Sequence, residues 1–431
     1  MSTTELTVRL FGQIACILAV CRGVGLVARR FGQPQVIAEM VAGVLLGPSL
    51  FGLLSPPAFR TLFPEESMKL LYPLAQLGLA LYMFVIGLEF RIDIIRQRLS
   101  SAIAVSVAGI ATPFALGALL GWALFSQTSL FPQSTTLLQA ALFLGASMSV
   151  TAFPVLARIL QAKNLTGTSV GAVALSAGAI GDAAAWGILA VILASLEGGL
   201  GRAFWNIAGG AAYVCVTGLV LRPWLAQWSR RIEARGELAE GEFVGCLGLL
   251  WLGAWVTDRL GLHAVFGAFV IGAAMPRGIV TRSLIAKVQP LTVAFLVPLF
   301  FTYSGLNTQM TLLSSASLWL LAGVILAVAI VGKGVACWLA ALASGLSNRE
   351  ALGVGVLMNA RGLMELIILN IGLERGILSP ALFAALVVMA VVTTIMTSPM
   401  FDWLARERPS LAEPMAAAEA NTRVSRSSVE R

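Results

Sequence analysis

One acidic residue, Asp182, lies near the middle of an apolar stretch, 168–195, that is otherwise free of charge. A charge at the centre of a bilayer costs at least about 3 kcal/mol, so an acid kept there is a candidate for function. A carboxylate can be neutralised by a proton or by a desolvated monovalent cation, and either one excludes the other. Asp182 therefore predicts a site at which a cation and a proton compete. A permanent pair with an arginine is the structural alternative.

A second stretch, residues 145–158, combines hydroxyl groups with a proline. Ser149 and Thr151 come shortly before Pro154 in the run Ser-Met-Ser-Val-Thr-Ala-Phe-Pro. Proline lacks an N–H and frees carbonyls of the preceding turn, so a helix broken here could offer oxygen ligands to an ion. We expect Ser149 and Thr151 to bind the ion together with Asp182. A proline kink that only shapes packing is the alternative.

A third stretch, residues 355–365, carries both signs of charge. Arg361 and Glu365 are four residues apart, which places them on one helical face, where they can neutralise each other. Gly362 permits an unwound stretch, whose helix-end dipoles need a compensating charge. We predict that Arg361 holds a crossing of broken helices together and sets the field at Asp182, while Glu365 is as suited to a structural as to a catalytic role. The predicted structural residues of the core are Pro154, Asn359, Arg361 and Glu365.

The elements that position these residues are membrane helices. Of 431 residues, 58% are apolar and only 12% are charged, with a mean hydropathy of +0.88, whereas about 25% of an ordinary soluble domain is charged. An integral membrane protein follows, so the net charge of +8 does not predict binding to nucleic acid. About thirteen apolar segments have spanning length. Their approximate limits are 7–28, 34–53, 70–90, 101–125, 136–160, 168–195, 203–226, 241–257, 261–276, 285–306, 316–344, 351–374 and 380–404.

The orientation follows from the loops. Assigning the Lys and Arg residues of the loops and span ends to alternate sides gives twenty on one side and six on the other. Positive charge collects on the cytoplasmic side. We expect thirteen spans with the N-terminus outside and the C-terminus cytoplasmic, in a bacterial inner (plasma) membrane.

Internal similarity indicates how the spans are organised. Residues 42–47 match 267–272, Gly87-Leu88 match Gly305-Leu306, and 145–155 match 355–365. Seven spans separate the members of each pair, so the two copies cross the membrane in opposite directions. An inverted repeat of six helices plus a linker helix is predicted, a plan common in secondary transporters, with the substrate site between the repeats.

The sequence has no motif typical of an enzyme or of a cofactor-binding site. The sequence contains no Ser-His-Asp set, phosphate-binding loop or H-E-x-x-H, and its five cysteines form no C-x-x-C pair. We predict no enzyme and no cofactor.

Four motifs, at residues 149–158, 181–186, 298–306 and 357–366, resemble the monovalent cation:proton antiporter-2 family of sodium/hydrogen exchangers, closest to the plant-type cation/proton exchanger branch. The similarity runs from about residue 8 to 405. It implies an all-α polytopic membrane protein with crossed broken helices, which exchanges Na⁺ or K⁺ for H⁺ by alternating access at Asp182. A channel-like K⁺ conductance, or transport of another small solute on the same fold, is the alternative.

The resemblance also implies a division into domains. Residues 1–99 and 236–315 would form a dimerisation domain, 100–196 and 316–405 a core ion-transport domain, and 197–235 a linker helix. Residues 406–431 are expected to be a disordered cytoplasmic tail, and no nucleotide-binding domain is expected. Members usually form homodimers embedded in the lipid bilayer.

One position departs from the family pattern. The residue before the aspartate is usually Asp in electrogenic members and Asn in electroneutral ones, and here it is Gly181. With a single carboxylate at the site, one proton per cation is the limit. We therefore expect electroneutral exchange.

Overall fold

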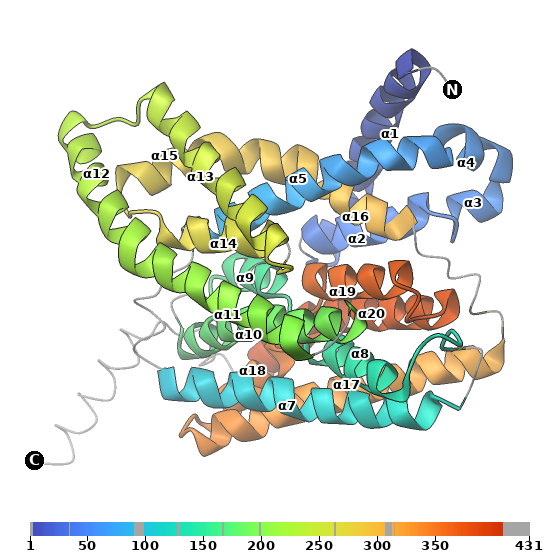
Figure 1. The fold of residues 1–431 in the computed structure, drawn as a ribbon. Helices are drawn as coiled ribbons and strands as arrows, with labels where there is room; N and C mark the ends of the chain where they lie inside the picture. Colours follow the sequence, from blue (N-terminus) through green and yellow to red (C-terminus); the bar gives the residue numbers. More distant parts are fainter. Residues whose placement is uncertain are drawn as a thin grey trace, which may run out of the picture. The chain divides into compact units, whose positions relative to one another are not determined.

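A computed structural model describes residues 3–33, 35–89, 99–126, 130–165, 168–197, 200–262, 264–306, 313 and 315–407. Every regular element in these ranges is helical (Figure 1). The helices of the first half are α1(Thr3–Arg30), α2(Gln35–Leu46), α3(Phe51–Leu54), α4(Pro56–Leu62), α5(Glu65–Glu89), α7(Leu99–Leu124), α8(Leu137–Ser149), α9(Phe153–Ala162) and α10(Ser169–Glu197). Those of the second half are α11(Leu200–Val216), α12(Arg222–Arg235), α13(Glu240–Arg259), α14(Ala264–Ala274), α15(Ile279–Leu291), α16(Val297–Leu306), α17(Ala316–Ala343), α18(Asn348–Leu357), α19(Leu363–Glu374) and α20(Pro380–Glu407).

Two short π-helical segments join consecutive helices without a break. Thr217–Leu221 connects α11 to α12, and Thr292–Leu296 connects α15 to α16. With these joins, each of the thirteen predicted spans coincides with one helix or with a consecutive pair. Eight helical stretches in the described ranges, three of them made of consecutive helices, are by length and composition able to cross a membrane. The predicted all-α polytopic fold is confirmed. Of the expected tail, residues 408–431 lie outside the described residues.

The helices form two compact units. Unit 1 comprises Met1–Gly25, Glu39–Phe90 and Trp186–Gln309, and unit 2 comprises Leu26–Ala38, Arg91–Ala185 and Met310–Arg431. Unit 1 has one hydrophobic cluster around Phe84 and Ile271 and another around Leu71 and Leu299.

Glycines allow four helices of unit 1 to approach closely. A Cβ atom added to Gly47, the residue directly after α2, would lie 2.5 Å from the carbonyl oxygen of Gly305 in α16. A Cβ atom added to Gly87 of α5 would lie 2.9 Å from the Cα of Gly272 in α14. In the sequence repeat Gly47 corresponds to Gly272, and Gly87 corresponds to Gly305. The contact of Gly47 with Gly305 therefore has an equivalent in the contact of Gly272 with Gly87, and both contacts join the first copy to the second. This reciprocal packing is the arrangement expected of the inverted repeat.

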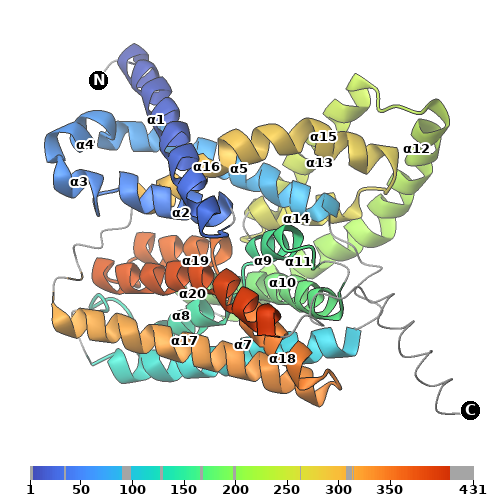
Figure 2. The same cartoon turned by 180° about the vertical axis from the view of Figure 1, so that it is seen from behind.

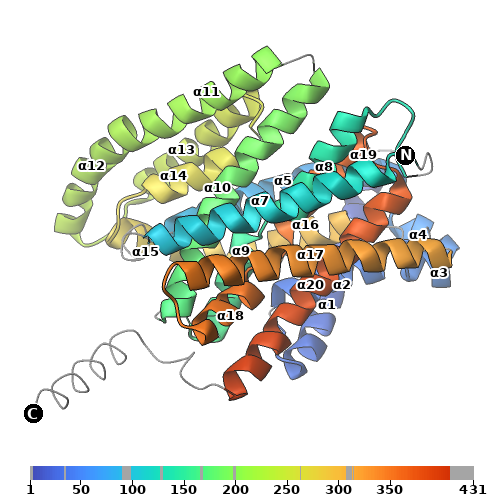
Figure 3. The same ribbon diagram turned by 90° about the horizontal axis from the view of Figure 1, so that it is seen from below.

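Unit 2 contains Asp182 and the two other stretches predicted to form the site, 145–158 and 355–365. Within it α7 and α17 lie side by side (Figure 3), and α19 lies beside α20 (Figure 2). Two of its helices begin at capping boxes, in which a hydroxyl side chain caps the first turn and a residue three positions later caps in return. These are Thr136 with Gln139 before α8, and Ser347 with Glu350 before α18.

Candidate ion-binding site

Two broken helices cross at their breaks inside unit 2. The fifth predicted span divides into α8, which ends at Ser149, and α9, which begins at Phe153. The twelfth divides into α18, which ends at Leu357, and α19, which begins at Leu363. The two interruptions meet, because the backbone N–H of Ala152 donates a 3.1 Å hydrogen bond to the carbonyl oxygen of Ala360.

The local sequence explains both interruptions. Pro154 is the second residue of α9, a position at which a helix has no acceptor for the missing N–H. The break therefore lies just before the proline. Gly362 stands immediately before α19 with φ +154°, a conformation that L side chains rarely adopt. The glycine therefore permits the sharp re-entry of the chain into a helix.

Two buried cationic side chains bind the carboxyl end of α8. Arg361 donates from Nη1 to the carbonyl oxygen of Ser147 at 3.1 Å and from Nη2 to that of Met148 at 2.7 Å. Lys333, from the middle of α17, donates to the carbonyl oxygen of Ser149. Both cations are 0% exposed. The last carbonyls of a helix lack intrahelical partners and carry the negative end of its dipole, so the two cations neutralise this end.

Glu365 completes the buried charges around the crossing. Its Oε1 lies 3.6 Å from Nη1 of Arg361, and both side chains are 0% exposed. Neither carboxylate oxygen accepts a hydrogen bond from any described residue. The predicted pair is thus an ion pair at longer range, because the shorter bonds of Arg361 go to α8.

Asp182 lies in α10 and is 1% exposed. A Cβ atom added to Gly178, one turn earlier, would lie 2.9 Å from Cδ2 of Leu156 and 3.6 Å from Cδ2 of Phe153. Residues four apart share a helical face, so Asp182 lies on the face of α10 that packs toward the first turns of α9. Among the described residues no donor is bonded to either of its carboxylate oxygens. No contact among the described residues of unit 2 therefore supports the alternative, in which Asp182 is permanently paired with an arginine.

Gly181 lies in the adjacent position with space beside it. A Cβ atom added there would have Ser106 Oγ of α7 at 3.6 Å, an ordinary contact distance. Steric crowding therefore does not explain why this chain lacks a larger residue before the aspartate.

The remaining predicted site residues are polar groups at the breaks. The Ser149 hydroxyl donates to the carbonyl oxygen of Ala146 at 2.9 Å, which leaves its lone pairs available to a cation. Thr151 is buried in the interruption itself. Asn359 donates from Nδ2 to the carbonyl oxygen of Gly355 at 2.9 Å, and its Oδ1 accepts no hydrogen bond from the described residues.

Sequence reasoning did not predict two of the contacts at this crossing. Lys333 was visible as a charge inside an apolar stretch, but nothing in the sequence related it to α8. Thr394 of α20 accepts a 3.1 Å hydrogen bond from the backbone N–H of Arg361. Threonine is common in membrane helices, so no signal distinguished Thr394 from its neighbours.

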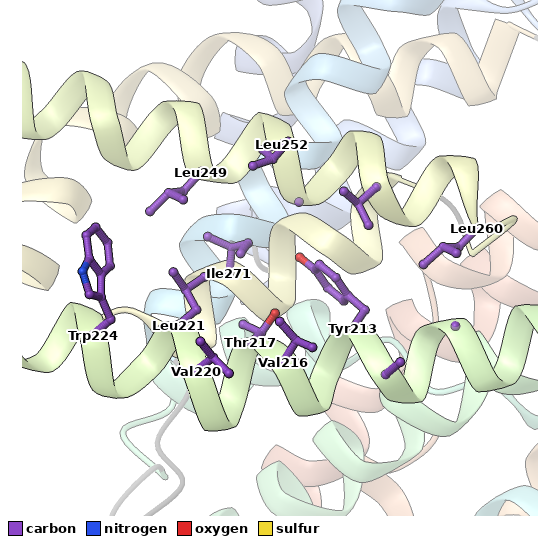
Figure 4. Close-up of a pocket in the computed structure, with 14 residues that line it drawn as sticks. Tyr213, Val216, Thr217, Val220, Leu221, Trp224, Leu249, Leu252, Leu260 and Ile271 are labelled. Atoms are coloured by element: carbon purple, nitrogen blue, oxygen red, sulfur yellow. The ribbon is translucent and has the colours of Figure 1, made fainter.

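An apolar pocket of about 730 Å³ lies within unit 1 (Figure 4). Helices α11 to α14 and the π-helical segment between α11 and α12 contribute its lining, which includes Val220, Leu252 and Ile271. The hydroxyl of Tyr213 donates to the carbonyl oxygen of Gly267 at 3.1 Å and is already satisfied. An apolar lining offers no ligands to a desolvated cation, so this pocket is not an ion site.

Comparison with known proteins decides the family. Residues 15–407 match the family model described as sodium/hydrogen exchanger, transmembrane. The chain belongs to this family. The family is one of transporters and not of enzymes, which agrees with the prediction from the motifs.

Individual members of the sodium/hydrogen exchanger family match over most of this chain. It is 38% identical over 400 residues to the Na⁺/H⁺ antiporter NhaS4 of Synechocystis sp., covering 92% of this chain and 97% of that one. It is 38% identical over 392 residues to cation/H⁺ antiporter 17 of Arabidopsis thaliana, covering 90% of this chain and 47% of the plant protein, so it spans about half of that relative. The plant-type resemblance is confirmed.

A solved structure shares the fold. The sodium proton antiporter MjNhaP1 from Methanocaldococcus jannaschii, at pH 8, superposes with a TM-score of 0.65, covering 95% of this chain and 99% of that chain. Its sequence identity is 14%, so this likeness supports the fold and not the substrate.

Proposed function

We propose that this sodium/hydrogen exchanger family member exchanges Na⁺ or K⁺ for H⁺ across the membrane by alternating access, with Asp182 as the group that both neutralise. One observation carries the proposal: a buried carboxylate on the face of α10 that packs toward α9, with no donor bonded to it in the described residues. A bare carboxylate is unfavourable in such surroundings, so a proton or a cation must occupy it. Ser149 and Thr151 are the proposed additional oxygen ligands.

Arg361 has a separate role in this proposal. Its guanidinium is held by the carbonyls of Ser147 and Met148, so it contributes a positive field near the crossing without occupying the carboxylate. Asn359, Glu365 and Pro154 are proposed to maintain the two breaks. The relatives named as Na⁺/H⁺ and cation/H⁺ antiporters support a monovalent cation as the substrate.

Exchange is proposed to be electroneutral, because Gly181 leaves one carboxylate and hence one proton for each cation. We further propose that unit 2 corresponds to the ion-transport domain and that unit 1 contains the dimerisation surfaces of a homodimer. The loop charges support an N-terminus outside and a cytoplasmic C-terminus. We propose a bacterial inner (plasma) membrane as the location.

The test is a proton-flux assay in everted membrane vesicles that contain a pH-sensitive dye. Na⁺, K⁺ and Li⁺ are added in turn to vesicles with the wild type, with Asp182→Asn, and with Glu66→Gln as a control at an exposed acid. Dye recovery should occur with the transported cation in the wild type and the control, and be absent in Asp182→Asn at equal amounts of folded protein. Coupled flux remaining in Asp182→Asn would exclude the proposed role. Flux that follows the membrane potential without a proton gradient would exclude exchange.

A further inference from the structure

The unwound stretch that carries Arg361 is attached to α20 through one side chain. Thr394 Oγ1 accepts a hydrogen bond from the backbone N–H of Arg361 at 3.1 Å and lies 2.8 Å from the carbonyl oxygen of the same residue. It also lies 2.7 Å from the carbonyl oxygen of Ala390, so its single proton is shared between two acceptors. Thr394 is 0% exposed. One hydroxyl thus satisfies both main-chain groups of a residue that has left its helix.

The threonines beside it make a different kind of contact. Thr393 donates to the carbonyl oxygen of Met389 at 2.8 Å, and Thr397 donates to that of Thr393 at 2.8 Å. Both are the ordinary bonds of a threonine to its own helix. Both residues are 0% exposed, like Thr394. Among the hydrogen bonds that these three buried threonines make with described residues, those of Thr394 alone reach outside α20.

We propose that Thr394 is a positioning residue for ion exchange, which keeps the Arg361 guanidinium on the carboxyl end of α8 and away from Asp182. This inference rests on the proposed role of Asp182. Buried main-chain groups must be hydrogen-bonded, so the hydroxyl fixes where the backbone of Arg361 lies. A fixed backbone allows the side chain to reach Ser147 and Met148. If the backbone is released, the guanidinium becomes a mobile cation that competes with Na⁺ or K⁺ for the carboxylate.

The first test measures transport in three valine variants that each lose one buried hydroxyl with little change in volume. Thr394→Val should raise the half-saturating cation concentration about tenfold, the factor expected for one lost buried hydrogen bond, with the rate at saturating cation nearly retained. Thr393→Val and Thr397→Val should behave as the wild type. Thr394→Ser, which keeps the hydroxyl, should restore the wild-type half-saturating concentration.

The second test reads the backbone directly and does not depend on transport. Hydrogen–deuterium exchange of the peptide containing Arg361 should be about tenfold faster in Thr394→Val than in Thr397→Val. If Thr394→Val does not accumulate as folded protein, Thr394→Cys, with its weaker donor, should give intermediate values in both tests. Equal amide exchange in all valine variants would overturn the attachment. Faster amide exchange in Thr394→Val with an unchanged half-saturating cation concentration would overturn the positioning role. Absence of cation-coupled proton flux in the wild type would instead count against the proposed function.

Discussion

The backbone N–H of Ala152 donates a hydrogen bond to the carbonyl oxygen of Ala360, at 3.1 Å, and so joins the two helix interruptions of unit 2 directly. Arg361, one residue further, binds the end of α8 through its side chain. Because main chain and side chain connect the same two breaks, neither can unwind further without disturbing the other. We expect the crossing to move as one body when the site changes its access.

The first prediction concerns pH. If a proton and a cation compete for Asp182, the half-saturating cation concentration should rise as the pH falls, by at most about tenfold for each pH unit. The rate at saturating cation should stay nearly constant over the same range. Dye-based flux measured at several fixed pH values checks this. A falling maximal rate with a constant half-saturating concentration would indicate separate proton and cation sites.

The second prediction concerns stoichiometry. Wild-type exchange in proteoliposomes should be insensitive to an imposed membrane potential. Gly181→Asp places a second carboxylate beside Asp182, where a Cβ atom finds only an ordinary contact with Ser106. A second proton for each cation should then make the rate depend on voltage. Gly181→Asn, similar in size but neutral, is the matched control and should remain insensitive, and a voltage-sensitive wild type would contradict the electroneutral assignment.

The third prediction concerns the buried charges. Arg361→Ala should lower the free energy of unfolding by about 3–5 kcal/mol, because it leaves Glu365 unpaired and exposes the end of α8 to an apolar interior. Glu365→Gln should cost less, since Arg361 keeps its bonds to Ser147 and Met148. Thermal unfolding in detergent measures both, with Arg349→Ala as a control at an exposed arginine. A larger loss in Glu365→Gln than in Arg361→Ala would contradict this account of the pair.

The fourth prediction concerns the close helix contacts of unit 1. Gly47→Ala should destabilise the protein by about 1–3 kcal/mol, because the added Cβ would lie 2.5 Å from the carbonyl oxygen of Gly305 and backbone cannot rotate aside. Gly12→Ala in α1 adds the same atom where nothing lies within 4 Å, so it should not destabilise. Equal unfolding temperatures for the two variants would show that α2 and α16 can separate at no cost.

The sequence was sufficient for the fold, and only partly sufficient for the site. Apolar length predicts where the helices lie, because the bilayer imposes this constraint on the local sequence. The positions of Pro154 and Gly362 in the sequence predict where the two helices are interrupted. The contacts of Lys333 with α8 and of Thr394 with Arg361 join residues 184 and 33 positions apart, and no local pattern encodes such distant pairs. Even for Arg361, spacing predicted the neighbour Glu365 but not the α8 carbonyls that take its shorter bonds.

The exchanged glycine contacts of unit 1 bear on the origin of the chain. Gly47 meets Gly305 and Gly87 meets Gly272, so both of these close contacts join different halves of the polypeptide. In a protein of half this length, these glycine surfaces would have found their partner only in a second copy inserted upside down. Duplication and fusion of a gene whose product entered the membrane in both directions would account for such mutual dependence, and would explain why a seventh, unpaired span had to be added between the halves.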